Sequence, residues 1–437
     1  MRVSFFGAAA EVGRSCIMLE SGDSRILLDA GVKIGNEKEE YPLIGDDDLG
    51  SIDGIFLSHA HLDHSAYLPH IYSEGYQNKT YATKPTSELV NILVNDYLKI
   101  SEPDNVSKDC MQGLQKHIAI AEYGSKIKVK DFTVRFLHAG HILGSAMVEV
   151  SDGKETAIYT GDVNFRKTRL LDGAQTEGIR ANTLITESTY GGDADIFPPE
   201  KVTLGAMTAS IKETLDSGGK VLMPSFGVGR AQEILLILDD YMKSGALPEV
   251  PIYTDGMVNK AMRIHRHNVI YCREELQRRI LMNDDDPFKS KNFVAVDTTQ
   301  QRRKIISENT SGIVVATSGM LTGGPILKYL ERLSGTEGNK IIFVGYQADG
   351  TRGREMIEGA KKISIGNRSV EIKLSVEQYR LSAHADRSQL SSFVSKIEDL
   401  EKIFVVHGEE AKSHEFAKSL SGKYSAIVPR LKSEHSV

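Results

Sequence analysis

Four separated stretches of this sequence carry side chains that can bind metal ions, and each stretch follows an apolar run. The first, FLSHAHLDHSAYLP, spans residues 56–69 and contains three histidines and one aspartate within a few positions. The others are FLHAGHILGSA, IYTGDVN and FVVHGEE. The candidate ligands are His59, His61, Asp63, His64, His141, Asp162 and His407. His138, also in the second stretch, is expected to be structural.

Neutral imidazoles and carboxylates are ligands that suit zinc. If residues 59–61 are extended, His59 and His61 point to one face, because side chains alternate along a strand; Asp63 and His64 then fall on the following turn. We assign the ligands to two ions: His59, His61, His141 and Asp162 to one, and Asp63, His64, Asp162 and His407 to the other. Two ions about 3.5–4 Å apart can share a water, lower its pKa and stabilise the attacking and leaving oxygens of a hydrolysis.

The elements that must position these ligands are predicted to be short strands ending in polar loops. RVSFFGA, RILLDAG, GIFLSHA, FTVRFLHAG and ETAIYTGDVN all have the composition of strands. TSELVNILVNDYLKI predicts a helix after Pro85, capped by Thr86 or Ser87. Its apolar face is expected to contain Leu89, Ile92, Leu93 and Tyr97.

The pattern changes after Glu187. Over residues 188–360 an apolar strand, a Gly-rich turn and a helix recur three times, in GKVLMPSFGVGRAQEILLIL, SGIVVATSGMLTGGPILKYL and NKIIFVGYQADGTRGREMIE. This alternation predicts a doubly wound α/β domain. From residue 361 the sequence returns to strands.

The Gly-rich turns of this middle segment suggest anion binding. PSFGVGRAQE leads into a helix near Arg230, ATSGMLTGG contains Ser318 and Gly319, and GYQADGTRGRE contains Arg352 and Arg354. Exposed amides at a helix N-terminus attract anions. Each turn alone is better explained as a tight turn that binds nothing. Their convergence at the strand ends of one sheet is the arrangement that such sheets use for ligands.

Two basic stretches, RIHRHN and QRRK, are either solvated helix faces or an electrostatic track for single-stranded RNA. Their basic residues are Arg263, His265, Arg266, His267, Arg302, Arg303 and Lys304. The formal net charge of -6 gives no overall attraction to a polyanion, so nucleic-acid binding would depend on such local surfaces and on metal ions.

Composition bounds the remaining possibilities. A chain of 437 residues predicts two or three domains. The three scattered cysteines argue against a disulfide framework and fit a reducing cytoplasm. No apolar run approaches about 18 residues, so no membrane span is expected. The first residues read as a strand and turn and lack the apolar stretch of a secretory signal.

The linked histidine and aspartate motifs resemble those of metallo-β-lactamase-fold hydrolases. In that resemblance LLDAG supplies Asp29, which would orient a ligand rather than bind metal. The inserted α/β segment, together with TESTYGG, LSAHADR and VVHGEE, resembles the β-CASP nucleases. That branch includes ribonuclease J and the nuclease subunit of the cleavage and polyadenylation specificity factor. The start, FFGAAAEVGRSCIMLES, is closer to archaeal homologues of the latter, of the shorter type without KH modules.

The resemblance implies an α/β architecture: a metallo-β-lactamase αββα sandwich with an inserted Rossmann-like β-CASP domain. The sandwich would comprise residues 1–187 and 361–437, and the insert residues 188–360. The family pattern makes His384 a general acid held in orientation by Glu187, with Asp63 also among the catalytic residues. Ser318, Arg230 and Gly319 match contacts to RNA phosphates. Two Zn2+ ions, single-stranded RNA and a possible homodimer complete the expectation.

Several functions stay open at this point. We expect a zinc-dependent ribonuclease that makes mainly internal cuts, in RNA processing or mRNA 3′-end formation, in the cytoplasm. A 5′-to-3′ exoribonuclease of the ribonuclease J type would use the same metal site. A small-molecule hydrolase of this fold would need neither His384 nor the anion turns. An inactive scaffold is disfavoured, because every expected ligand is present. DNA is not excluded as substrate, because phosphate contacts do not identify the sugar.

Overall fold

The computed structural model describes residues 1–34, 39–101, 103, 106 and 110–437. They form two compact units. Unit 1 comprises Met1–Lys167, Leu171–Ile196 and His384–Val437, and unit 2 comprises Thr168–Leu170 and Phe197–Ala383. The sequence pattern predicts that the insert spans residues 188–360. Whether the domains fold independently within those limits stays a prediction. No helix among the described residues is long and apolar enough to cross a membrane.

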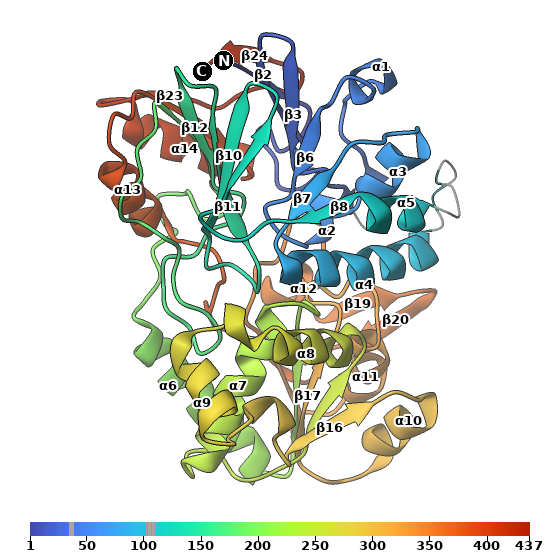
Figure 1. The fold of residues 1–437 in the computed structure, drawn as a ribbon. Coiled ribbons are helices and arrows are strands. Elements are labelled where there is room, and N and C mark those ends of the chain that lie inside the picture. Colours follow the sequence, from blue (N-terminus) through green and yellow to red (C-terminus); the bar gives the residue numbers. More distant parts are fainter. Residues whose placement is uncertain (35–38, 102, 104–105, 107–109) are drawn as a thin grey trace. The chain divides into compact units, whose positions relative to one another are not determined.

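Unit 1 is built on two seven-stranded sheets (Figure 1). The first sheet contains, in spatial order, β24 (Glu434–Ser436), β1 (Arg2–Phe5), β2 (Ile17–Ser21), β3 (Ser24–Leu28), β6 (Gly54–Phe56), β7 (Thr80–Ala82) and β8 (Ile118–Ile120). The second contains β23 (Ser425–Ile427), β22 (Lys402–Val406), β13 (Thr183–Glu187), β12 (Thr156–Tyr159), β11 (Ala146–Ser151), β10 (Phe132–His138) and β9 (Lys126–Val129). A short ribbon pairs β4 (Lys33–Ile34) with β5 (Glu39–Glu40).

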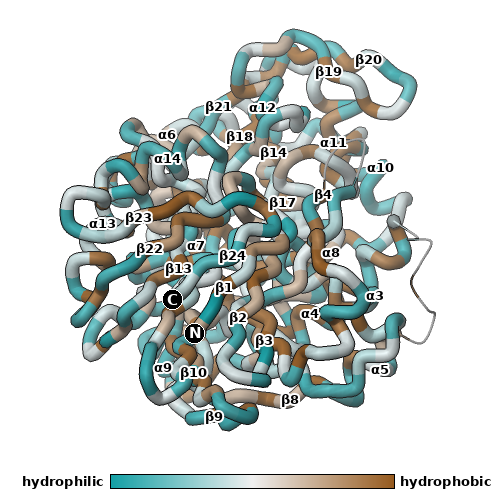
Figure 2. The backbone as a smooth tube through the Cα atoms, turned by 90° about the horizontal axis from the view of Figure 1, so that it is seen from above, coloured by the Kyte–Doolittle hydropathy of each residue, from teal (hydrophilic) through white to brown (hydrophobic). Residues whose placement is uncertain are grey.

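The two sheets pack face to face around one apolar core. Phe5 and Phe56 of the first sheet and Phe136 and Phe404 of the second are all fully buried in it. The longer strands contribute alternate side chains to this core, such as Phe132, Val134 and Phe136 of β10, as the period-two pattern requires. Hydrophobic stretches therefore follow the strands in Figure 2, whereas turns and outer helices are more hydrophilic.

Helices cover the outer faces of both sheets in unit 1. The segment between β6 and β8 supplies α2 (Leu62–Ser65), α3 (Leu68–Ser73), α4 (Lys84–Ser101) and α5 (Cys110–His117), and α1 (Asp46–Leu49) precedes them. On the second sheet, α13 (Arg387–Lys396) and α14 (Glu410–Leu420) pack over strand residues such as Ile158 and Val405. The predicted αββα sandwich is therefore confirmed (Figure 1).

One predicted helix differs in detail. α4 begins at Lys84, and Thr83 Oγ1 accepts the Thr86 amide at 3.3 Å, so the cap precedes the proline rather than following it. Thr86 itself donates its hydroxyl to the carbonyl of Gly144 at 2.9 Å. The buried face contains Val90 and Val94 beside Leu89 and Tyr97, whereas Ile92 and Leu93, expected inside, are only half-buried.

Unit 2 contains a six-stranded parallel sheet. Its spatial order is β16 (Phe293–Val296), β15 (Ile252–Asp255), β17 (Gly312–Ala316), β14 (Lys220–Pro224), β18 (Lys340–Phe343) and β21 (Ser375–Gln378). The helices are α6 (Glu200–Asp216), α7 (Arg230–Lys243), α8 (Met257–His267), α9 (Glu274–Met282), α10 (Thr299–Ser307), α11 (Ile326–Leu333) and α12 (Arg352–Ile357). Two 3-10 turns, Val269–Tyr271 and Pro287–Lys289, and the hairpin β19 (Lys362–Ile365)–β20 (Arg368–Glu371) complete it.

The helices of unit 2 lie on both faces of its sheet. α6, α7 and α8 share one core with strand residues such as Val221 and Val315. α10 and α11 contribute to the other core, with Leu222 and Val314. The predicted doubly wound domain is confirmed by this arrangement.

β14 and β17 are neighbouring strands whose ends meet, since Pro224 pairs with Ala316. The loops that follow them run to opposite faces of the sheet, because α7 lies on one face and α11 on the other. That point is the switch of strand order at which such sheets bind ligands.

Candidate metal centre and active site

The HAHLDH motif reaches its position through a loop and a short helix. β6 ends at Phe56, so His59 and His61 lie in the loop that follows it, and Asp63 and His64 lie in α2. The two histidines therefore lie just beyond the end of the strand, and the loop brings them together. The backbone of α2 packs directly on the loop after β3, because a Cβ added at Gly31 would lie 1.7 Å from the carbonyl oxygen of Asp63.

The first predicted ligand group is assembled in unit 1. His61 Nδ1 lies 3.2 Å from His59 Nε2 and 3.2 Å from His141 Nε2. Asp162 Oδ2 lies 3.5 Å from His59 Nε2 and 3.6 Å from His141 Nε2. One ligand atom from each of these four side chains therefore faces a common point.

The second predicted group lies beside the first. Asp63 Oδ2 lies 3.8 Å from His64 Nε2 and 3.6 Å from His407 Nε2. Asp162 Oδ1 lies 3.4 Å from His64 Nε2 and 3.7 Å from His407 Nε2. Asp162 thus directs one oxygen at each group, which is the position of a bridging carboxylate.

These side chains fit a pair of zinc ions. Ligand atoms about 2.0–2.1 Å from a tetrahedral zinc lie about 3.3 Å from each other, close to the separations within both groups. Asp162 Oδ1 is buried and has no hydrogen-bond donor among the described residues, an arrangement that is costly unless a cation compensates it. Burial raises the pKa of Asp162, but the neighbouring histidines, His407 and His64 foremost, outweigh burial and hold it well below its ordinary value.

Asp29 fixes the orientation of His64. It is fully buried, and its Oδ2 lies 2.6 Å from His64 Nδ1. The same carboxylate accepts the amide and hydroxyl of Ser58 at 2.7 and 2.6 Å and the Tyr159 hydroxyl at 2.8 Å. With Nδ1–H donated to Asp29, His64 Nε2 keeps a lone pair directed at the second group. Asp29 thus lies outside the ligand groups, as expected for an orienting residue.

Two of the strand-end residues adopt left-handed backbone conformations that turn their side chains into the centre. Asp29 has φ 60° directly after β3, and His407 has φ 47° directly after β22. Non-glycine residues adopt such angles rarely, and they concentrate at functional sites.

His384 and Glu187 form a pair beside the two groups. His384 Nδ1 lies 3.1 and 3.2 Å from the two carboxylate oxygens of Glu187, and its ring packs 4.6 Å from that of His141. Glu187 is fully buried at the end of β13, and its Oε1 also accepts the amide of Val163 at 2.7 Å. Burial lowers the pKa of His384, but Glu187 and Asp162 outweigh it and raise the pKa to about 9. Glu187, His384 and Asp162 could also hold an ion, yet the Glu187 oxygens are already engaged.

The other predicted residues lie where the strands of unit 2 end. Ser318 Oγ accepts the Gly323 amide at 3.1 Å, and a Cβ at Gly319 would lie 2.9 Å from the Phe226 amide, so only glycine fits there. Arg230 starts α7 and is buried. The turn GYQADGTRGRE packs on the turn ATSGMLTGG, because Gln347 Nε2 donates to the Gly319 carbonyl at 3.0 Å.

Not every charged residue of these turns is available to a ligand. Arg352 donates to the carbonyls of Leu321 and Ser364, at 3.0 and 2.5 Å, and so holds the turn itself. His138 lies outside both histidine groups, with Nδ1 3.3 Å from the carbonyl oxygen of Gly173.

Sequence reasoning missed the hydroxyls that hold the histidines. Ser15 Oγ lies 3.0 Å from His407 Nδ1 and 3.5 Å from His64 Nε2. Ser58 contacts Asp29 and also lies 3.0 Å from His59 Nδ1. Ser58 directly precedes the first histidine and could have been noticed, whereas nothing in the sequence around Ser15 marks it.

A sandwich of this topology with two adjoining histidine and aspartate groups defines the metallo-β-lactamase class of metal-dependent hydrolases. Three family models match successive parts of the chain. A metallo-beta-lactamase superfamily domain matches residues 18–189, a Beta-Casp domain residues 231–356, and a Zn-dependent metallo-hydrolase RNA specificity domain residues 369–429.

Curated relatives match nearly the whole chain. A transcription termination factor FttA of Methanocaldococcus jannaschii is 39% identical over 437 residues, covering 96% of this chain and 69% of the relative. Its counterpart from Methanothermobacter thermautotrophicus is 37% identical over 441 residues, covering 97% and 69%. The chain therefore belongs to the β-CASP family of metallo-β-lactamase-fold nucleases, as its motifs predicted.

A crystal structure of a protein of unknown function from Enterococcus faecalis has the same fold. It is 14% identical, with a TM-score of 0.62 and coverage of 99% of both chains. At this identity the likeness concerns the fold alone.

Proposed function

We propose that this protein is a two-zinc ribonuclease that hydrolyses phosphodiester bonds in single-stranded RNA, mainly by internal cuts. The observation that carries the proposal is the carboxylate of Asp162, which lies between two histidine groups with the His384–Glu187 pair beside it. The RNA specificity domain matched at residues 369–429 and the termination factors among the relatives support RNA as the substrate. RNA processing or 3′-end formation is the proposed setting, in the cytoplasm.

His59, His61, His141 and Asp162 would hold one ion, and Asp63, His64, Asp162 and His407 the other. When bound, two Zn2+ ions lower the pKa of water and stabilise charge that develops on phosphate oxygens. Zinc is the metal that a set of imidazoles and carboxylates with these separations favours.

His384 acts as the general acid in this proposal. Its Nδ1 donates to Glu187, so the proton available for transfer is on Nε2. With the pKa raised to about 9, the imidazolium is the main form at neutral pH. It would deliver this proton to the ribose oxygen that leaves phosphorus. Glu187 fixes the ring plane and stabilises the charged form.

Ser318, Gly319 and Arg230 would contact the RNA backbone from unit 2. Gly319 lets the turn pack closely on Phe226 beside Ser318, and the Arg230 guanidinium would supply a charge-assisted donor to phosphate. A homodimer remains compatible with this function and stays a prediction.

The test uses one single-stranded RNA labelled separately at each end, in 5′-monophosphate and 5′-triphosphate forms, with zinc-loaded protein. Internal fragments from both forms would support the endonuclease. Mononucleotides released from the 5′ end, mainly of the monophosphate form, would replace it by a ribonuclease-J-type exonuclease. No cleavage by the zinc-loaded protein would refute the nuclease function on that substrate and favour a small-molecule hydrolase.

A further inference from the structure

The two basic stretches of unit 2 lie on different faces of its sheet. α8, which carries RIHRH, packs through Val258 into the core shared by α6 and α7. α10, which carries QRRK, packs through Ile305 into the opposite core. The two stretches therefore do not form a single continuous basic track.

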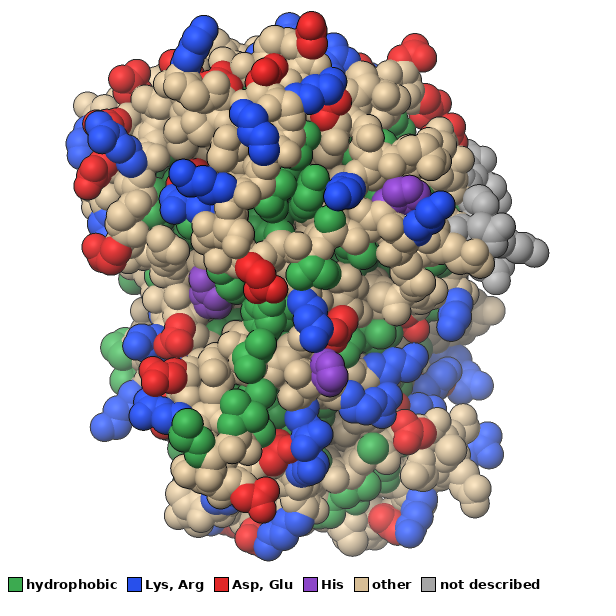
Figure 3. All heavy atoms as spheres, in the orientation of Figure 1, with side chains coloured by type: hydrophobic (Ala, Val, Ile, Leu, Met, Phe, Trp, Pro, Cys, Tyr) green, Lys and Arg blue, Asp and Glu red, His purple; other side chains and the backbone are tan. Residues whose placement is uncertain are grey.

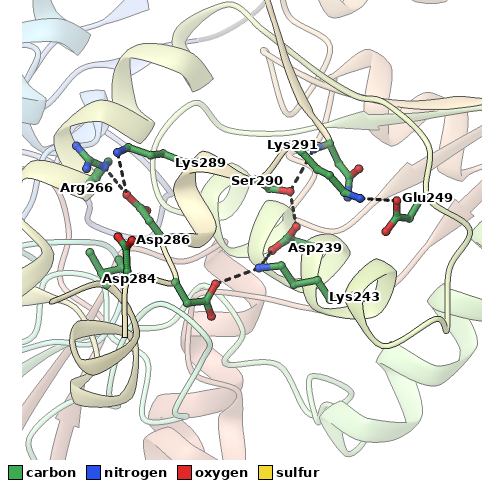
Figure 4. Close-up of a pocket in the computed structure, with 12 residues that line it drawn as sticks. Asp239, Lys243, Glu249, Arg266, Asp284, Asp286, Lys289, Ser290 and Lys291 are labelled. Carbon is green, nitrogen blue, oxygen red and sulfur yellow. Dashed lines mark hydrogen bonds and ion pairs between the residues drawn. The ribbon is translucent and has the colours of Figure 1, made fainter. Parts of the chain in front are cut away.

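Three of the seven basic residues already form ion pairs with carboxylates. Arg302 binds both oxygens of Asp255, at 2.8 and 2.9 Å. Arg266 Nε donates to Asp286 at 2.5 Å, and Figure 4 shows Arg266 and Lys289 both directed at this carboxylate. Lys304 Nζ lies 3.7 Å from Glu308.

His265 is also unavailable. It is fully buried, its Nδ1 lies 2.8 Å from the carbonyl oxygen of Ala261, and burial lowers its pKa to about 4.

Arg303 remains as a single exposed cation on α10. The other remaining cations lie on one face of α8. Lys260, Arg263 and His267 are exposed and make no ion pair with any described residue. Their spacing of three and four positions places them in one row on the helix. The row extends over about 10 Å, given a rise of about 1.5 Å per residue. Lysines, arginines and a histidine gather over α8 in Figure 3, on a chain whose formal net charge is -6.

Helix stability does not explain this row. Cations near a helix C-terminus are stabilised by the macrodipole, which accounts for His267. Lys260 lies at the opposite end of α8, near its start at Met257, where the macrodipole disfavours a cation and favours an anion. A phosphate bound there would be attracted by both the lysine and the helix.

The start of α8 adjoins the loop that carries Ser318. A Cβ added at Gly256, the residue before α8, would lie 2.4 Å from Thr317 Oγ1, so the start of α8 packs closely against the Thr317 side chain. Thr317 directly precedes Ser318. A strand held at the Ser318 loop therefore meets the row of cations at its Lys260 end.

We infer that the exposed row Lys260, Arg263 and His267 on α8 binds the phosphate backbone of single-stranded RNA beyond the Ser318 loop. This inference rests on the proposed ribonuclease function. The row offers two full charges to phosphates and an imidazole for hydrogen bonding or stacking on a base. It extends the bound length of the substrate without adding a group to the reaction.

The test compares Lys260→Gln/Arg263→Gln with Lys126→Gln/Lys154→Gln, which removes two exposed lysines of unit 1 that make no ion pair with described residues. Glutamine preserves helix propensity. Both pairs are made in the full chain carrying His384→Ala, loaded with zinc. Binding of a long single-stranded RNA is measured by fluorescence anisotropy over a salt series, and a gel checks that the RNA stays intact. Thermal melting checks that both variants fold.

Each single-strand phosphate contact contributes about 0.7 to the slope of log affinity against log salt, so losing two contacts lowers the slope by about 1.4. Between 1 M salt, where the phosphate contacts contribute little, and 0.1 M salt, this change in slope corresponds to an affinity that is about 25-fold lower. We expect this loss for the α8 variant and not for the lysine control. Equal slopes and affinities in the two variants would overturn the inference.

Failure of the proposed function is recognised separately, because it is read on the wild-type protein. If wild-type protein cuts the RNA but the α8 variant binds like its control, only the inference falls. If zinc-loaded wild type cuts no RNA, the ribonuclease function itself fails.

Discussion

Replacing Asp29 by asparagine should weaken one metal site selectively. Asp29 Oδ2 faces three donors: His64 Nδ1 at 2.6 Å, the Ser58 hydroxyl at 2.6 Å and the Tyr159 hydroxyl at 2.8 Å. An amide NH2 in that place would itself donate to His64 Nδ1, which moves the imidazole proton to Nε2. A protonated Nε2 has no lone pair for a metal.

The expected size follows from this change of tautomer. Loss of such an orienting partner typically weakens metal binding 10–100-fold, which corresponds to about 1.4–2.7 kcal/mol. The affected ion is the one assigned to the His64 group, because Asp29 contacts no histidine of the other group except through Ser58. The zinc at the His59 group should therefore bind nearly as in the wild type. The zinc at the His64 group should bind about 10–100-fold more weakly.

Competition with a zinc chelator measures both affinities, and elemental analysis after dialysis counts the ions. Asp53→Asn is the matched control: its carboxylate accepts the Arg25 amide at 2.9 Å in the same unit and belongs to neither histidine group. Asp29→Asn protein that retains two zinc ions with wild-type affinities would refute the role assigned to Asp29. Equal weakening in the control would attribute the effect to general destabilisation.

Three further outcomes are expected. His384→Ala should lower the single-turnover cleavage rate about 10²–10⁴-fold with both zinc ions retained, whereas loss of zinc would identify His384 as a ligand. Glu187→Gln should lower the rate and leave RNA affinity unchanged; a change confined to affinity, measured by anisotropy, would contradict its orienting role. Because burial lowers the pKa of His265 to about 4 from 6.5, protonation favours the unfolded chain. The free energy of unfolding should therefore fall by about 2 kcal/mol between pH 7 and pH 5. In urea unfolding, His265→Leu should remove this fall. A variant with the same pH dependence as the wild type would contradict the role of His265.

The ligands of the candidate centre could be predicted because each follows an apolar run that forms a strand. His59, His141 and Asp162 lie just beyond β6, β10 and β12, as the sequence pattern indicated. The grouping into two sets also agrees with the distances, since a carboxylate with two oxygens is the natural bridge. The role of these residues as ligands stays a proposal.

Contacts between distant segments could not be predicted in the same way. Ser15 meets His407 across 392 positions, and Tyr159 reaches Asp29 across 130. Hydroxyls of this kind have no periodicity or motif, and only the packed sheets bring them into place. The same limit applied to α4, where tertiary packing selected Val90 and Val94 for the core in place of two residues of similar hydrophobicity.

The basic stretches illustrate the limit for surface charge. Their sequences do not distinguish an arginine neutralised by Asp255 or Asp286 from one that faces solvent. Lys260, outside both stretches, became part of the row only because the helix places it three positions before Arg263. Ion pairing and burial are tertiary properties, so charge must be sorted with the structure.

The most direct test of the central claim is a zinc titration of metal-free protein, with RNA cleavage measured at each addition. The two histidine groups joined by Asp162 predict that cleavage requires bound zinc and saturates near two equivalents. Asp162→Ala should abolish cleavage and reduce zinc binding at both groups. Full cleavage of RNA by metal-free protein, or undiminished cleavage by Asp162→Ala, would contradict the two-zinc ribonuclease.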